Sequence, residues 1–320
     1  MITGASAGVG RATAIEFAKE GATIALLARN RESLEGAKKE VEQNGGKGRV
    51  YVVDVADAEK MEETAAAIEK EIGPVDIWIN NAMVSVFSPF KEITPAEYKR
   101  VTDVTYLGQV YGTMAILNRM LKRDKGKIVL VGSALAYRGI PLQAPYCGAK
   151  HGIQGFFDSL RSELLHDKSG VKVSMVELPA LNTTQFGWVK SRLSKKAKPM
   201  GGIYQPEVAA KAIKYAAIHD RREIFVAFPT FQSIIGNKFF PGLLDNIMAK
   251  TGFKGQQTDE PEDPNRPNNL WEPVPGDHTA RGPFNKSAKN KSPMLWVSTH
   301  WRIVWLVLII LFIVLIWLIV

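Results

Sequence analysis

Residues 127–150 read KIVLVGSALAYRGIPLQAPYCGAK, and this stretch decides the fold. Its beginning, residues 128–131, holds only branched and aliphatic side chains, which is typical of a buried parallel strand. The strand ends at Gly132 and Ser133, and Pro145 then fits the first turn of a helix, where its missing N–H costs nothing. This order predicts an open α/β sheet whose site lies at the carboxyl ends of its strands.

A glycine-rich turn opens the chain: Thr3-Gly4-Ala5-Ser6-Ala7-Gly8-Val9-Gly10 follows a short strand and precedes a helix over residues 11–20. Glycines let the backbone approach a pyrophosphate, which the free N–H groups of a helix amino end bind. Only two residues precede the turn, whereas a strand usually runs about five. Either the natural start lies upstream or the sequence is a fragment.

The second strand, residues 23–27, ends at Ala28-Arg29-Asn30. An NAD site would place Asp or Glu there on the ribose hydroxyls, whereas a guanidinium suits the 2′-phosphate of NADP. NADP is therefore the favoured cofactor and NAD the less favoured alternative. Ser6 would add a hydroxyl to that phosphate site.

Together these motifs resemble the short-chain dehydrogenase/reductase family over roughly residues 1–230. Asn80-Asn81-Ala82 lies between the glycine turn and Ser133, which precedes Tyr146-x-x-x-Lys150 by thirteen residues. The resemblance implies a Rossmann-type doubly wound parallel sheet in a single domain, with catalytic Ser133, Tyr146 and Lys150. The cofactor contacts that it implies are Gly4, Ser6, Gly8, Val9, Gly10, Arg29, Asp54, Val55, Asn81, Ala82, Tyr146, Lys150, Leu181 and Thr183.

The chain departs from the family pattern at three places. Met83 stands where a glycine is usual, and Thr105, in a helix expected over residues 95–121, stands where an asparagine commonly holds a water. A hydroxyl has one donor where an amide has two. In residues 178–183, which resemble the nicotinamide carboxamide site, the proline is displaced by one position, and Thr184 is the alternative to Thr183.

The chemistry expected of this site is hydride transfer between a nicotinamide and a carbonyl or alcohol. A carbonyl that accepts hydride builds negative charge on its oxygen and needs hydrogen-bond donors there. Tyr146 would be the acid, with its pKa lowered by the positive charge of Lys150, and Ser133 would donate the second hydrogen bond. No metal is implied.

Apolar residues favour a lipophilic substrate. We expect one wall of the pocket to come from the loop before Tyr146 and another from the lid, residues 186–202, which carries Trp188. The loop residues expected there are Leu135, Tyr137, Ile140, Leu142 and Gln143.

The end of the chain predicts a membrane anchor. Residues 303–320 carry no charge, and eighteen helical residues at ~1.5 Å each cross most of a bilayer core of ~30 Å. A buried core helix is the alternative. Basic residues before this stretch, together with the positive-inside tendency, place the enzyme domain on the cytoplasmic side.

The composition divides the chain into three parts. Residues 1–254 form the Rossmann domain, and residues 297–320 form the transmembrane helix. Between them, residues 255–296 are rich in proline and charge and are expected to be a disordered tether, because they carry too little apolar surface to fold alone.

The formal net charge of +9 is scattered, which argues against a nucleic-acid partner. The expected partners are a lipophilic carbonyl or alcohol, the membrane and, by resemblance to the family, a second copy in a homodimer. The alternative function is an NADP(H)-binding scaffold or sensor at a membrane, with little turnover.

Overall fold

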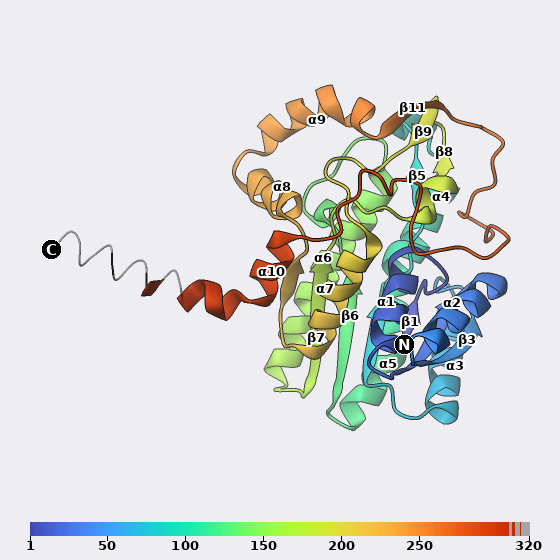
Figure 1. Ribbon diagram of the computed structural model, residues 1–320, viewed down its shortest axis with the longest axis vertical. Coiled ribbons are helices and arrows are strands. Elements are labelled where there is room, and N and C mark those ends of the chain that lie inside the picture. Colours follow the sequence, from blue (N-terminus) through green and yellow to red (C-terminus); the bar gives the residue numbers. More distant parts are fainter. Residues whose placement is uncertain (307–308, 311–313, 315–320) are drawn as a thin grey trace.

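Seven parallel strands form one sheet in the computed structural model, which describes residues 1–306, 309–310 and 314 (Figure 1). The strand order is β10-β7-β6-β4-β1-β2-β3. The strands are β1 (Ile2–Thr3), β2 (Thr23–Ala28), β3 (Lys47–Val52), β4 (Ile77–Asn80), β6 (Gly126–Val131), β7 (Val171–Glu177) and β10 (Glu223–Phe225). Chain order reverses between β1 and β4, so their carboxyl ends form the crevice in which open α/β sheets bind ligands. The predicted doubly wound sheet is confirmed.

Helices cover both faces of this sheet (Figure 1). One face packs on α1 (Gly8–Ala18), α2 (Arg31–Gln43) and α7 (Pro206–Ile218). The other face packs on α3 (Ala58–Glu71), α5 (Gly108–Lys122) and α6 (Ala144–His166). Apolar residues spaced three and four apart bury one stripe of each helix against the strands, as α2 does with Leu34, Ala37 and Val41.

A π-helical turn interrupts the helix predicted over residues 95–121. The segment begins as α4 (Pro95–Thr102), passes through the turn at Asp103–Leu107 and continues as α5. Thr94 caps α4 by accepting from the Glu97 N–H, and the Glu97 carboxylate accepts from the Thr94 N–H. Isolated π turns occur frequently at functional sites, and this one contains Thr105.

Short strands and late helices build the outer part of the molecule. β5 (Val86–Phe87) pairs with β8 (Lys190–Ser191), and β9 (Lys195–Ala197) pairs with β11 (Gln257–Pro261). The late helices are α8 (Phe228–Phe239), α9 (Pro241–Gly255) and α10 (Pro293–Thr299). Both α8 and α10 pack beside β10.

The segment predicted to be a disordered tether, residues 255–296, instead lies against the domain. β11 belongs to it, and Leu270 is fully buried in the core beside α4 and α5 residues. Few apolar side chains hold this segment, but its backbone carbonyls find arginine and asparagine donors on the domain. We call residues 266–284 the strap. The domain boundaries drawn at 254 and 296 stay predictions.

The predicted anchor falls partly on residues 307–308, 311–313 and 315–320, which lie outside the described residues. Among the residues that the structure does describe, no helix has both the length and the apolar composition needed to cross a bilayer.

Gly112 tests how tightly α5 packs on the sheet. A Cβ at Gly112 would lie 2.3 Å from Asn80 Oδ1, whose amide links Trp78 to Thr113. Gly112→Ala should therefore lower the free energy of unfolding by about 1–3 kcal/mol, the usual cost of overpacking. Urea denaturation would measure it.

The matched control is Gly155→Ala in α6, where a Cβ would meet no atom within 4 Å. This change should leave stability equal or raise it by up to about 1 kcal/mol, because alanine favours a helix over glycine. Equal effects of the two substitutions would contradict the packing described here.

Candidate active site

A cavity of about 690 Å³ opens at the carboxyl edge of the sheet. It brings together residues that are far apart in the sequence. The predicted site residues that line it are Gly4, Ser6, Gly8, Val9, Arg29, Asp54, Val55, Asn81, Ala82, Ser133, Tyr146, Lys150, Leu181 and Thr183. Gly10, which was also predicted to contact the cofactor, does not line the cavity. It supports the turn from behind, because a Cβ there would lie 2.1 Å from the Gly4 carbonyl oxygen.

The glycine turn fits a dinucleotide phosphate. Gly4 and Gly8 have φ of +65° and +56°, a conformation that strains other residues. At the start of α1 the Gly8 N–H donates to the Thr279 carbonyl, while the Val9 and Gly10 N–H groups meet no acceptor in the described part of the chain. Two donors at the positive end of a helix therefore remain for an anion.

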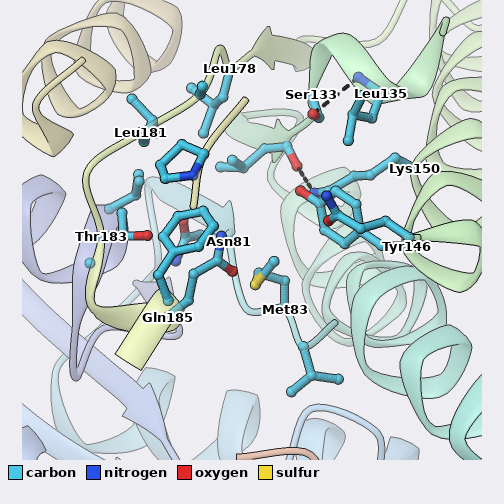
Figure 2. Close-up of a pocket in the computed structure, with 18 of the residues that line it drawn as sticks. Asn81, Met83, Ser133, Leu135, Tyr146, Lys150, Leu178, Leu181, Thr183 and Gln185 are labelled. Carbon is cyan, nitrogen blue, oxygen red and sulfur yellow. Dashed lines mark hydrogen bonds between the residues drawn. The ribbon is translucent and has the colours of Figure 1, made fainter. Parts of the chain in front are cut away.

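Ser133, Tyr146 and Lys150 lie on the wall of the cavity opposite Leu181 and Thr183 (Figure 2). Ser133 follows β6, and the other two project from the first turns of α6, which Pro145 opens. The Ser133 hydroxyl accepts from the Leu135 N–H at 3.1 Å. The Lys150 ammonium lies 5.5 Å from the centre of the Tyr146 ring and is only 1% exposed.

Burial governs the pKa values of the two titratable groups. It raises the pKa of Tyr146 above its ordinary value, and a hydrogen bond with Ser133 only partly opposes this. The predicted lowering by Lys150 is therefore not found. Burial also lowers the pKa of Lys150 to about 8, against the effect of the nearby Glu177 carboxyl. The ammonium donates to the Val131 carbonyl at 2.7 Å instead of meeting the phenol oxygen.

Gln109 supplies an amide that the sequence reasoning missed. Thr105 is saturated, since its hydroxyl donates to the Val84 carbonyl and accepts from the Val84 N–H. One turn later, Gln109 donates to the same Val131 carbonyl that holds Lys150, at 3.1 Å. Its Oε1 is buried without a partner among the described residues. A glutamine four residues after the position where an amide is usual was the signal available.

Glu177 was also missed. It ends β7, is fully buried, and neither carboxyl oxygen has a partner within hydrogen-bond distance in the described structure. Burial raises the pKa of Glu177 well above its ordinary value, and the nearby Glu223 carboxylate raises it further. A Cβ at Gly132 would lie 2.6 Å from it, so this carboxyl underlies the turn that carries Ser133. A lone acid at the end of an apolar strand was its sequence signal.

The predicted substrate wall is correct in part. Leu135, Ile140, Gln143 and Trp188 line the cavity, and so does Met83, which shares its wall with Asn81 (Figure 2). Two other loop residues do not line it. Tyr137 turns away and donates to Glu223, and Leu142 is buried in a separate apolar cluster, with φ of +69°.

Helices α8 and α9 add a wall that was not predicted. The cavity residues that they contribute are Pro229, Thr230, Gln232, Ser233, Leu244, Ile247 and Met248. Thr184 also lines the cavity beside Thr183, and its hydroxyl is buried without a partner in the described structure. Either threonine thus stays a candidate for the nicotinamide contact.

The half of the cavity at the end of β2, away from Tyr146, is basic. Arg29 lies there, and Arg100 pairs with Asp54 at 2.5 Å. The Arg29 guanidinium donates to the Asn269 and Trp271 carbonyls of the strap, at 2.5 and 2.6 Å. Burial lowers the pKa of Arg29, although the group stays charged.

The chain is similar in sequence to known proteins. Residues 1–192 match the family model described as short chain dehydrogenase. An uncharacterized oxidoreductase of Bacillus subtilis, YxnA, is 31% identical over 280 residues, which are 87% of this chain and 79% of that protein. Human 17-beta-hydroxysteroid dehydrogenase 13 is 34% identical over 253 residues, covering 78% of this chain and 81% of the relative.

Solved structures of dehydrogenases have a similar fold. An alcohol dehydrogenase from Thermococcus sibiricus in complex with 5-hydroxy-NADP has a TM-score of 0.61 and 26% identity, and the match covers 70% of this chain and 93% of that one. An NAD⁺-bound xylitol dehydrogenase has a TM-score of 0.54 and 29% identity, with 56% and 68% covered. On the family match and the identity to these relatives, the chain belongs to the short-chain dehydrogenase family and is an oxidoreductase.

Proposed function

We propose that this oxidoreductase interconverts a carbonyl and an alcohol with NADP(H), on a lipophilic substrate at a membrane. The observation that carries the reaction type is that Ser133, Tyr146 and Lys150 share one wall of a cavity that also contains the glycine turn. The names of two relatives support carbonyl or alcohol chemistry. One is the human 17-beta-hydroxysteroid dehydrogenase 13, and the other is a 3-dehydrosphinganine reductase of Danio rerio, 31% identical over 226 residues that are 68% of each chain.

Each of the three side chains has one role. When bound, the dinucleotide supplies or takes up the hydride. Tyr146 gives its hydroxyl proton to the substrate oxygen, and Ser133 donates a hydrogen bond to the same oxygen. The Lys150 ammonium stays beside the phenol and stabilises the negative charge that the phenol then carries.

Replacing the phenol tests this assignment. Tyr146→Phe should lower kcat for carbonyl reduction by roughly 10²–10⁴-fold, the range for loss of a positioned acid. The affinity for NADPH, measured by its fluorescence, should stay the same because the ring remains. The control is Tyr137→Phe, which removes a phenol that faces Glu223 outside the cavity and should keep its turnover.

A Tyr146→Phe variant with full activity would show that another group is the acid. A wild-type chain that binds NADPH but reduces no carbonyl would favour the scaffold or sensor function instead.

The preference for NADP rests on charge at the end of β2. Arg29 lines the cavity, Arg100 lies nearby, and residues 28–30 contain no carboxylate that could hold ribose hydroxyls. The solved alcohol dehydrogenase with 5-hydroxy-NADP supports this preference, whereas the xylitol dehydrogenase with NAD⁺ shows that similar folds bind either cofactor.

Arg29→Gln should weaken NADPH binding about 10- to 100-fold, because a hydrogen bond to a charged group contributes about 1.5–3 kcal/mol. NADH binding should change little, since NADH lacks the 2′-phosphate. Titration calorimetry would measure both. Arg31→Gln, an exposed neighbour in α2, is the control of equal charge. Equal weakening of NADPH and NADH by Arg29→Gln would remove the basis for the preference.

The membrane assignment rests on exposed apolar side chains of the two helices that wall the cavity, α8 and α9. Exposed apolar side chains lie in α8, in α9 and between them: Phe239, Phe240, Leu243 and Ile247. Both helices also contribute residues to the cavity. These helices lie on the side of the molecule from which α10 leads to the C-terminal segment (Figure 1). Exposed apolar patches of this kind mark interaction surfaces. A substrate dissolved in the bilayer would reach the cavity here, with the predicted anchor holding the domain on the cytoplasmic side.

The double variant Phe239→Ser, Phe240→Ser tests this route in the full chain. Burying each phenylalanine contributes roughly 1.5–3 kcal/mol, so the apparent KM for a long-chain methyl ketone in phosphatidylcholine vesicles should rise at least about tenfold. The KM for a short, water-soluble ketone should not change. Phe90→Ser, an equally exposed site near α4, is the control. Parallel changes for both ketones would argue against a membrane route.

A further inference from the structure

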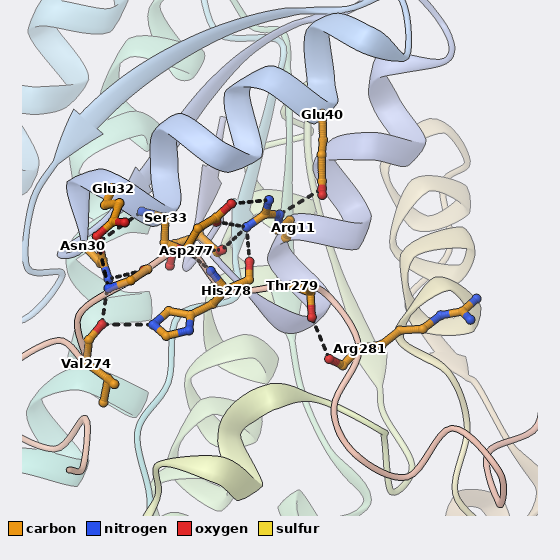
Figure 3. Close-up of polar contacts among 12 residues, drawn as sticks. Arg11, Asn30, Glu32, Ser33, Glu40, Val274, Asp277, His278, Thr279 and Arg281 are labelled. Carbon is orange, nitrogen blue, oxygen red and sulfur yellow. Dashed lines mark hydrogen bonds and ion pairs between the residues drawn. The ribbon is translucent and has the colours of Figure 1, made fainter.

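The strap (residues 266–284) borders the basic half of the cavity and contacts residues of α1 and α2 (Figure 3). Four of its residues line the cavity: Asn269, Pro273, Val274 and His278. The His278 ring meets the Trp188 ring of the lid edge to face, with centroids 4.4 Å apart. The strap and the lid (residues 186–202) thus contact each other, and both line this half of the cavity.

Two arginines hold the first part of the strap. Arg29 binds the carbonyl oxygens on either side of Leu270, and Arg100 donates to the Leu270 carbonyl itself at 3.0 Å. The Leu270 side chain is the only buried apolar side chain of the strap among the described residues, at 0% exposure. This end is therefore fixed to the core.

Polar contacts hold the middle of the strap, residues 276–279, together with the His278–Trp188 ring contact. Asp277 pairs with Arg11 at 2.6 Å, and Arg11 also donates to the His278 carbonyl (Figure 3). The His278 N–H donates to Ser33 Oγ at 3.1 Å, and the Thr279 carbonyl accepts from the Gly8 N–H at 3.2 Å. Arg11 belongs to α1 and Gly8 to the glycine turn, so these contacts fasten the strap directly beside the phosphate site. We call the Asp277–Arg11 pair the latch.

The far end of the strap is held by the Phe284 ring, which meets the Phe186 ring edge to face with centroids 5.7 Å apart, and by the Phe284 N–H, which donates to Asn182.

The Leu270 part and the latch differ in how easily they separate from the domain. Release of Leu270 would expose apolar core, whereas opening of the latch would exchange hydrogen bonds with protein for hydrogen bonds with water, and each such exchange costs about 0.5–3 kcal/mol. Segments that have few buried apolar contacts open locally without global unfolding. The stretch between Leu270 and Phe284 can thus open locally while both of its ends stay on the domain.

We propose that the strap is the outer wall of the adenosine half of the cofactor site, and that the dinucleotide is loaded and released only while the latch is open. This inference rests on the proposed function, because it assumes that the cavity binds NADP(H). Val274 and His278 would then contact the adenosine side of the ligand. Release of the dinucleotide would be limited by opening of the latch.

Gly36 offers a substitution that opens the latch without weakening the fold. It lies in α2 and faces Asp277, and a Cβ there would lie 2.3 Å from both carboxylate oxygens. Gly36→Ala should displace the carboxylate from Arg11, while alanine favours the helix over glycine. Stopped-flow fluorescence should show NADPH release roughly 10- to 100-fold faster, the effect of losing one charge-assisted contact. Amide hydrogen exchange of residues 271–284 should rise in parallel.

Asp277→Asn, which removes the charge and keeps the shape, should accelerate release in the same direction. Gly155→Ala is the matched control, since a Cβ there meets nothing within 4 Å, and its release rate should equal that of the wild type. Wild-type release rates in both Gly36→Ala and Asp277→Asn, with NADPH still bound by all variants, would overturn the strap inference alone. A wild-type chain that binds neither NADPH nor NADH would overturn the proposed function as well.

Discussion

The carbonyl oxygen of Val131 joins the fold to its chemistry. It is the last carbonyl of β6, and it accepts the Lys150 ammonium at 2.7 Å and the Gln109 amide at 3.1 Å. A buried ammonium is costly without a hydrogen-bond partner. Because β6 pairs with β4 on one side and β7 on the other, this acceptor cannot move. One backbone atom thus fixes α6 and α5 around the Tyr146 phenol.

The hydrogen bonds to the Val131 carbonyl explain how the chain accommodates its departures from the family pattern. Thr105 bonds fully to Val84 and leaves no donor for the active site. Gln109, placed after the π-helical turn, brings an amide to Val131 from the same helix. The Glu177 carboxyl lies under the neighbouring turn of Ser133, so the polar groups beneath the cavity come from β6, β7 and α5 together.

The regular elements could be predicted because their patterns are local. An apolar run before Gly132, a proline at the start of α6 and a glycine-rich turn each follow from neighbouring residues. The position of Leu142 could not be predicted, because no sequence pattern indicates that a leucine will adopt a φ of +69°. The strap was missed for a different reason. Counting its own apolar residues ignores the partners that Arg29, Arg100 and Arg11 offer to its backbone and to Asp277.

Measuring kcat/KM for NADPH against pH tests the central claim most directly, because this ratio reports groups of the free enzyme. Burial lowers the pKa of Lys150 to about 8, whereas Tyr146 stays protonated above that pH because burial raises its pKa. For carbonyl reduction the ratio should be constant at lower pH and fall as Lys150 loses its charge, with a limb near pH 8. A ratio that stays flat through this range, or that rises across it, would contradict the role given to the buried ammonium at Val131.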